Sequence, residues 1–277
     1  MKTLFLGTSS FAVPSLRVVA AKTDLAGVVT QPDRPAGRGQ RLRPSAVKAA
    51  ALDLGVPVSE PRRLGEFAAE ARTAAYDLFV LAAYGRMLPH ELLDVPRLGA
   101  LNVHPSLLPQ YRGATPIQSA LRNGDAHTGV SIMLMDAGMD TGAIVCSRGV
   151  DISPEETYGE LHDRLAEIGA QLLGEALDSA ALGRIAAVPQ QGDPSVTRPI
   201  LPEDLTIDWS WAPERVAAFV RAFSPQPGAR ALLNGEMVKV LRAHVASDGT
   251  LAIDELIAPN RPRMSWEAYE RSRRDRA

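Results

Sequence analysis

Short apolar runs alternate with stretches of helical character along the first half of the chain, and this alternation limits the possible folds more than any other feature. The runs span residues 4–6, 25–29, 56–58, 78–83 and 100–103. The last two runs are continuously apolar, as expected of strands that are covered on both faces. Buried strands separated by helices predict an α/β layer fold with a mostly parallel sheet.

Helix signals fall between and after these runs. Ser45 can cap a helix that stops at Gly55. Past Thr157, apolar residues recur at helical spacing over residues 161–176, and Thr157 with Glu160 fits a capping box. We therefore expect a long amphipathic helix that closes the first domain.

A polar segment rich in proline separates two parts of the chain that differ in character. Prolines at positions 189, 194, 199 and 202 favour an irregular connection. We predict a first domain over residues 1–188, a linker over 189–204 and a second domain over 205–277.

The second domain has its own pattern of elements. Apolar residues over 216–223 predict a short helix, and Asn234-Gly235 between two β-prone runs is a strong hairpin signal. Residues 250–257 read as a further strand. About three strands are expected in this domain.

Composition excludes several classes of protein. The 277 residues are 45% hydrophobic, and 30 basic against 32 acidic residues give a net charge of -2, so bulk charge does not favour nucleic acid. Cys146 is the single cysteine, which leaves no disulfide within the chain and no thiolate cluster for a metal. No run approaches the roughly 18 apolar residues of a membrane span, and the N-terminal run is too short for a signal peptide. We expect a cytoplasmic protein without a membrane partner.

The densest set of chemically useful side chains follows the last apolar run. Asn102, His104 and Ser106 occupy alternate positions, so an extended backbone would turn their side chains to one face. The carboxyl ends of strands are where α/β folds bind ligands. An amide donor beside an imidazole base suits attack on a carbonyl group, so we expect the chemistry here.

A histidine base needs a carboxylate that fixes its tautomer and stabilises its charge. Asp136 and Asp140 both lie in the glycine-containing stretch 135–142, and spacing alone does not choose between them. A covalent mechanism through Ser106 is disfavoured, because the Gly-x-Ser-x-Gly elbow is absent and Pro105 stiffens the loop.

An arginine-rich stretch follows the second apolar run. Residues 31–44 hold four arginines and one acidic residue, which gives a local charge of about +3 at neutral pH. By itself such a stretch is ordinarily a solvated surface loop. Close to an active-site face it suits the phosphate backbone of a nucleic acid, and both interpretations stay open on the residues alone.

Taken together, these segments resemble the methionyl-tRNA formyltransferase family. The matching pieces cover nearly the whole first domain: Gly7-Thr8 with Phe11 to Pro14, Thr30 to Gly39, Ala83-Tyr84-Gly85, Asn102-x-His104 with Ser106 to Pro109, Arg112-Gly113-Ala114 and Met139 to Gly142. Formyltransferases that use 10-formyltetrahydrofolate share the Asn, His and Asp set, whereas the arginine loop is specific to the branch that modifies tRNA.

The resemblance implies a Rossmann-like formyltransferase domain followed by a C-terminal β domain of the OB type that helps to hold tRNA. It implies that the catalytic residues are Asn102, His104 and Asp140, which resolves the choice of carboxylate. Contacts with the folate are implied for Ser106, Leu107, Leu108, Pro109, Tyr84 and Gly85. Contacts with tRNA are implied for Arg34, Arg38, Arg41 and Arg43, of which Arg38 reads the unpaired end of the initiator acceptor stem.

The implied reaction transfers a formyl group from 10-formyltetrahydrofolate to the free amino group of initiator methionyl-tRNA, for translation initiation. We expect a monomer and no metal. Because an OB barrel needs five strands, about three strands over residues 205–277 predict a shortened second domain. Two alternatives stay open, a folate-dependent N-formyltransferase of amino sugar nucleotides and a non-catalytic homologue that binds folate or RNA.

Overall fold

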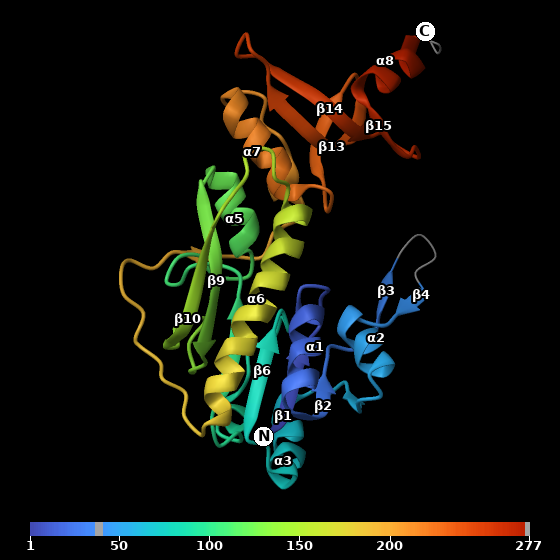
Figure 1. Ribbon diagram of the computed structural model, residues 1–277. Coiled ribbons are helices and arrows are strands. Elements are labelled where there is room, and N and C mark those ends of the chain that lie inside the picture. The colour runs from blue at the N-terminus through green and yellow to red at the C-terminus, as the bar shows by residue number, and fades with distance from the viewer. Residues whose placement is uncertain (37–40, 275–277) are drawn as a thin grey trace. The chain divides into compact units, whose positions relative to one another are not determined.

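The computed structural model describes residues 1–36 and 41–274, and its contacts divide the chain into two compact units. The first unit consists of Met1–Ala114, Gly129–Gly149 and Asp163–Val196. The second consists of Thr115–Thr128, Val150–His162 and Thr197–Ala277. Figure 1 shows the elements of both. The boundaries that the proline-rich segment suggested at residues 188 and 204 stay a prediction.

A seven-stranded sheet forms the centre of the first unit, in the order β10-β9-β7-β6-β1-β2-β5. Its strands are β1 (Lys2–Gly7), β2 (Asp24–Val29), β5 (Val58–Ser59), β6 (Leu78–Ala82), β7 (Ala100–His104), β9 (His127–Leu134) and β10 (Ile144–Asp151). β1 pairs in parallel with β2 and β6, β2 with β5, and β6 with β7, whereas β9 runs antiparallel to β7. The mostly parallel α/β sheet that the sequence predicted is confirmed.

Helices cover both faces of this sheet, which explains why its strands read as continuous apolar runs. Leu4 and Leu6 pack with the apolar side of α3 (Leu64–Ala74) in one cluster. On the other face, α6 (Tyr158–Ala181) comes so close to β7 that a Cβ on Gly169 would lie 2.8 Å from a methyl of Val103. A helix alongside it, α1 (Ala12–Lys22), also contacts the central strands (Figure 1).

Two predicted helix starts are confirmed by their hydrogen bonds. Ser45 caps α2 (Ala46–Asp53) by accepting the backbone N–H of Lys48 at 3.0 Å. At the start of α6, the N–H of Thr157 donates to the Glu160 carboxylate at 2.8 Å, and the Glu160 N–H lies 3.5 Å from the Thr157 hydroxyl. α4 (His90–Leu93) is a single turn.

The second unit has a four-stranded antiparallel sheet with β12 (Ala229–Leu233), β13 (Glu236–Val245), β14 (Leu251–Ile257) and β15 (Arg263–Ser265) in that order. The predicted hairpin at Asn234-Gly235 is confirmed, since both residues have positive φ angles, 52° and 80°. Its helices are α5 (Pro116–Asn123), α7 (Pro213–Phe223) and α8 (Trp266–Arg274), with a 3₁₀ turn at Pro202–Leu205.

The expected count of about three strands in this unit was therefore one too low. β15 has three residues, Arg263, Met264 and Ser265, and so short a strand carries no alternation to detect. Phe219 and Phe223 of α7 are buried against the sheet with Tyr269 of α8. The described chain builds an open sheet of four strands here, not the five strands of a complete OB barrel.

Candidate active site

The carboxyl ends of three central strands are tied together at one backbone carbonyl. The carbonyl of Tyr84, just past β6, accepts a hydrogen bond from the Thr8 hydroxyl at 3.0 Å and from the Gln31 side chain at 2.7 Å. Thr8 follows β1, and Gln31 follows β2. In chain order the sheet grows from β1 to β2 on one side and then returns to β6 on the other, so these strand ends form a topological switch point, the usual place of ligand binding in open α/β sheets.

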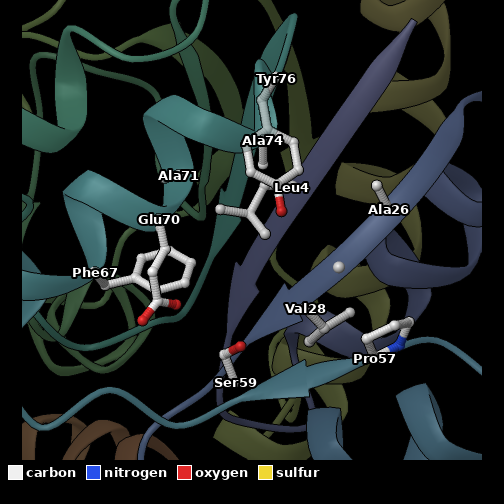
Figure 2. A pocket seen from close by; sticks show the side chains of 11 residues that line it. Leu4, Ala26, Val28, Pro57, Ser59, Phe67, Glu70, Ala71, Ala74 and Tyr76 are labelled. Carbon is white, nitrogen blue, oxygen red and sulfur yellow. The ribbon is translucent and has the colours of Figure 1, made fainter.

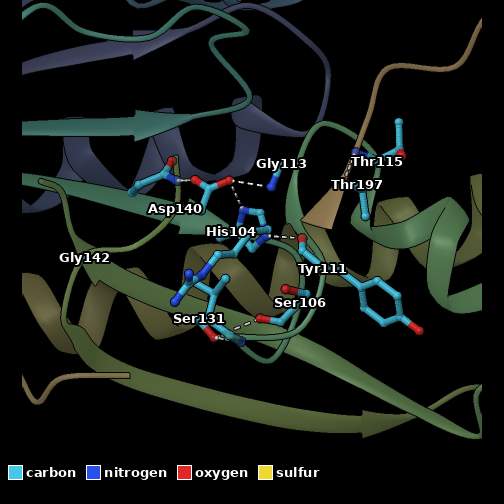
Figure 3. Close-up of polar contacts among 12 residues, drawn as sticks. His104, Ser106, Tyr111, Gly113, Thr115, Ser131, Asp140, Gly142 and Thr197 are labelled. Atoms are coloured by element: carbon cyan, nitrogen blue, oxygen red, sulfur yellow. Dashed lines mark hydrogen bonds and ion pairs between the residues drawn. The ribbon is translucent and has the colours of Figure 1, made fainter. Parts of the chain in front are cut away.

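Asn102 and His104 lie at the end of β7, the strand beside β6. The structure brings both side chains to one carboxylate. The Asn102 Nδ2 atom lies 3.5 Å from Oδ1 of Asp140, and the His104 Nδ1 atom lies 3.7 Å from Oδ2 (Figure 3). The strand alternation that predicted a shared face for Asn102 and His104 is thus confirmed.

The structure places Asp140, and not Asp136, beside the histidine. Asp140 has a left-handed backbone with φ 53°, and its Oδ2 accepts the N–H of Gly113 at 2.7 Å. Asp136 instead holds its own loop, because its carboxylate accepts the Gly138 N–H at 3.0 Å and the Thr141 hydroxyl at 2.6 Å. The two carboxylates that sequence spacing could not separate therefore have different partners.

His104 is only 4% exposed, and both ring nitrogens face protein groups. Its Nε2 atom lies 2.9 Å from the carbonyl oxygen of Tyr111 (Figure 3). Burial lowers the pKa of His104 below the ordinary imidazole value, and the Asp140 carboxylate and the Tyr111 carbonyl oppose this lowering. Burial therefore favours the neutral imidazole, while Asp140 favours the protonated one.

Ser106 does not continue the alternation of Asn102 and His104, because β7 ends at His104. Its buried hydroxyl donates to the carbonyl of Gln110 at 2.5 Å. Its own carbonyl accepts the Ser131 hydroxyl of β9 at 2.8 Å, and that hydroxyl accepts the N–H of Leu108 at 3.2 Å. Ser106 thus shapes the loop that carries Leu107, Leu108 and Pro109, and its hydroxyl is already engaged.

The arginine stretch forms a hairpin of β3 (Arg34–Ala36) and β4 (Arg41–Arg43). Arg34 lies directly opposite Arg43 in the antiparallel register, and Ala36 lies opposite Arg41. Arg38 lies outside the described residues.

Ion pairs and hydrogen bonds anchor the base of this hairpin. Lys48 donates to Asp33 at 2.9 Å and to Glu60 at 2.8 Å, and Arg34 donates to the Gln31 side chain at 2.5 Å. Gln31 is also bonded to the Tyr84 carbonyl, so the hairpin is connected to the carboxyl ends of the central strands.

A separate cavity of about 210 Å³ lies between α3 and the strands β1, β2 and β5 (Figure 2). Its lining combines apolar residues such as Phe67 and Val28 with the polar groups of Glu70 and Tyr76. None of the predicted site residues lines it, so it is not the catalytic site.

Within residues 1–36 and 41–274, no group of three or more acidic, histidine or cysteine side chains is arranged to hold a metal ion. No helix in these ranges is long and apolar enough to cross a membrane.

The site combines an amide donor, an imidazole and a carboxylate, and the serine beside them is tied into its loop. That set can stabilise an oxyanion and move a proton, which suits acyl transfer to an amine without a covalent intermediate on the enzyme. The family described as formyl transferase matches residues 1–177, and its C-terminal domain matches residues 199–252. Fold and site thus define a formyl-transferring enzyme.

Sequence comparison narrows this class. A methionyl-tRNA formyltransferase of Geobacter metallireducens is 40% identical over 291 residues, covering 96% of this chain and 94% of the relative. A methionyl-tRNA formyltransferase of Dechloromonas aromatica is 47% identical over 264 residues, covering 92% of this chain and 85% of the relative. The chain belongs to the methionyl-tRNA formyltransferase family.

Solved structures share the fold at lower identity. The N-formyltransferase from Helicobacter canadensis, in complex with folinic acid and dTDP-3-aminofucose, has a TM-score of 0.68 at 20% identity and covers 89% of this chain and 88% of its own. The methionyl-tRNA formyltransferase from Clostridium thermocellum has a TM-score of 0.63 at 15% identity and covers 93% and 98%. At these identities the likeness shows the common fold alone.

Proposed function

We propose that this enzyme transfers the formyl group of 10-formyltetrahydrofolate to the α-amino group of initiator methionyl-tRNA, the modification used in translation initiation. The observation that carries the proposal is the convergence of Asn102, His104 and Asp140 at the end of β7. Identities of 40% and 47% to named methionyl-tRNA formyltransferases support the choice of acceptor. We further propose that the enzyme acts as a monomer in the cytoplasm.

The proposed chemistry is direct attack of the amine on the formyl carbon. Asn102 donates an amide N–H to the oxyanion that forms, and His104 accepts the amine proton at Nδ1. Asp140, 3.7 Å from that nitrogen, stabilises the resulting imidazolium. When the bond between the formyl carbon and N10 of the folate breaks, His104 returns the proton to N10, so atoms and charges balance.

The folate is proposed to lie along the loop after β7 and the turn after β6. Leu107 and Leu108 are half-buried and so leave some surface open to a ligand, whereas Ser106 and Pro109 are buried. In the turn after β6, Tyr84 is buried and Gly85 is exposed with a φ of 76°. A Cβ at Gly85 would lie 2.8 Å from Gln31 Nε2, so this position favours glycine on two counts. Two solved neighbours hold folinic acid and tetrahydrofolic acid, which supports a folate-derived donor.

The arginine hairpin is proposed to bind the acceptor end of the tRNA. Arg34 and Arg43 lie directly opposite each other, an arrangement in which like charges repel unless an anion is bound between them. A nucleic-acid phosphate supplies that anion. Arg38 and Arg41 belong to the same proposal from their sequence positions.

A second candidate acceptor is an amino sugar nucleotide. One structural neighbour was solved with dTDP-3-aminofucose, and the open four-stranded sheet of the second unit is smaller than a complete OB barrel. An enzyme of this kind would keep Asn102, His104 and Asp140 and would not need the arginine hairpin.

The deciding experiment offers labelled 10-formyltetrahydrofolate to the enzyme with charged initiator methionyl-tRNA in one arm and dTDP-3-aminofucose in the other. Labelled formyl on the tRNA, lost in His104→Ala, is the expected result. If only the sugar nucleotide is formylated, methionyl-tRNA is not the acceptor and the amino sugar nucleotide takes its place. Transfer to neither, with folate still bound, would favour a non-catalytic homologue.

A further inference from the structure

Part of the segment after α6 is hydrogen-bonded to loops of the first unit. We call residues 188–195 the strap, because backbone and side-chain hydrogen bonds fasten them to the site loops of the first unit. The strap begins with a backbone bridge between Val188 and Ile144. Near its end, the Ser195 carbonyl accepts the N–H of Arg112 at 2.9 Å, and the Ser195 hydroxyl accepts the N–H of Tyr111 at 2.7 Å.

Gln190, in the middle of the strap, uses the whole of its side-chain amide. Its Nε2 group donates to the carbonyls of Asp140 and Gly142, each at 2.8 Å. Its Oε1 atom accepts from the Arg112 guanidinium, at 3.1 Å from Nε and 2.7 Å from Nη2. One amide therefore joins the loop that carries Asp140 to the loop that carries Arg112.

These two loops hold both neighbours of the His104 ring. The Arg112 loop also supplies the Tyr111 carbonyl that faces Nε2 and the Gly113 N–H that holds the Asp140 carboxylate. The other loop supplies Asp140, whose left-handed backbone needs support from its surroundings. A cross-link between the loops therefore fixes the carboxylate relative to the imidazole.

We infer that Gln190 is a positioning residue that holds Asp140 beside His104. The role in turnover rests on the proposed function, whereas the role in placing Asp140 does not. An amide suits this position because it supplies two N–H donors and one acceptor at once. A glutamate there keeps the acceptor for Arg112 and loses both donors, and a leucine loses all of these groups.

The test compares Gln190→Leu and Gln190→Glu with Gln191→Leu, a matched control at an exposed neighbouring glutamine. The first readout is the titration of His104 by NMR with labelled histidine, assigned by the loss of its signal in His104→Gln. Asp140 is the charged group that faces this ring, and it raises the pKa of His104 against burial. Gln190→Leu should therefore titrate at lower pH than the wild type, and Gln191→Leu should match the wild type. The added carboxylate of Gln190→Glu itself raises the pKa of a nearby imidazole, so that variant is compared by its kinetics.

The second readout is steady-state kinetics of formyl transfer. We expect kcat to fall about 10- to 100-fold in the Gln190 variants, with the KM for the folate changed less than kcat, because misplacement of a reacting group by about 1 Å has an effect of this order. If Gln190→Leu does not fold, the test uses Gln190→Glu instead, because this variant keeps the contact with Arg112. An unchanged His104 titration with unchanged kcat in a folded Gln190 variant would overturn the inference. If the wild type transfers no formyl group, the proposed function fails, and the NMR titration still decides the role of Gln190.

Discussion

Nδ1 of His104 and Oδ2 of Asp140 face each other at 3.7 Å, which is close enough for charge stabilisation and too far for a hydrogen bond. The other ring nitrogen, Nε2, lies 2.9 Å from the carbonyl of Tyr111. A carbonyl only accepts, so in the neutral ring Nε2 carries the proton and Nδ1 holds a lone pair. Nδ1 is thus the atom able to take up a proton, and Asp140 stabilises the charge that results.

Acid should destabilise the folded protein in part through His104. Burial lowers the pKa of His104 in the folded state, so below about pH 6.5 the unfolded chain binds a proton there that the folded chain does not. Stability therefore rises with pH through this window, by at most about 1.4 kcal/mol per pH unit for one proton. Urea unfolding at pH 5.5 and 7.5 should show a smaller difference in His104→Gln than in the wild type. An equal difference in both proteins would contradict the prediction.

Asn102→Ala should remove the proposed oxyanion donor. We expect kcat for formyl transfer to fall about 100-fold to 1000-fold, the usual cost of losing such a donor. The fold should survive, because Asn102 is half-buried and its side-chain contact with Asp140 is long, at 3.5 Å. Thermal unfolding checks the fold, and turnover close to the wild-type value would remove Asn102 from the mechanism.

Asp140→Asn should move the pH dependence of catalysis. Without the carboxylate that raises the pKa of His104, burial lowers that pKa further, so the acid limb of the kcat profile shifts to lower pH. The plateau should fall as well, because the imidazolium loses its stabilising charge. Asp136→Asn is the matched control, since Asp136 bonds only within its loop in the contacts that the structure gives. If the pH profile of kcat shifts in Asp136→Asn and not in Asp140→Asn, Asp136 rather than Asp140 is the carboxylate that acts on His104.

Alanine substitution of Arg34 or Arg43 should weaken tRNA binding in a way that depends on salt. Log affinity falls linearly with log salt concentration, and each lost phosphate contact makes this slope less steep by about 0.7 to 0.9. The affinity for initiator tRNA, measured at several salt concentrations between about 50 and 200 mM, gives this slope. Arg63→Ala is the control, because Arg63 is exposed and pairs with Glu66 outside the hairpin. Slopes equal to the wild type in both hairpin variants would exclude these arginines from phosphate contact.

Gly142→Ala should disturb the loop that carries Asp140. A Cβ there would lie 1.9 Å from the backbone oxygen of Leu134, which cannot move aside as a flexible side chain would. Overpacking of this kind typically costs about 1 to 3 kcal/mol of unfolding free energy. Gly65→Ala in α3 is the control, because nothing lies within 4 Å of its Cβ position, and it should be neutral or slightly stabilising. Denaturant midpoints of the two variants provide the comparison.

Local patterns in the sequence determined a large part of the fold. The apolar runs predicted the strands β1, β2, β6 and β7, and these were confirmed with parallel pairing among them. Caps at Ser45 and Thr157 were visible because they depend on neighbours within three residues. The Asn234-Gly235 turn was visible for the same reason, since it depends on the backbone freedom of two adjacent residues.

The sequence by itself determined the alternating strands and helices and the placement of Asn102 and His104 on one face of a strand, because these follow from short-range periodicity and chirality. Spacing left Asp136 and Asp140 open and the family resemblance favoured Asp140, but only the tertiary structure shows its carboxylate beside His104. Only the tertiary structure decided that Ser106 turns into its own loop and that Gln190 joins two site loops. Such contacts join residues as far apart as Arg112 and Gln190. No local pattern encodes them, because they arise when packing of the sheet brings distant loops to the same strand ends.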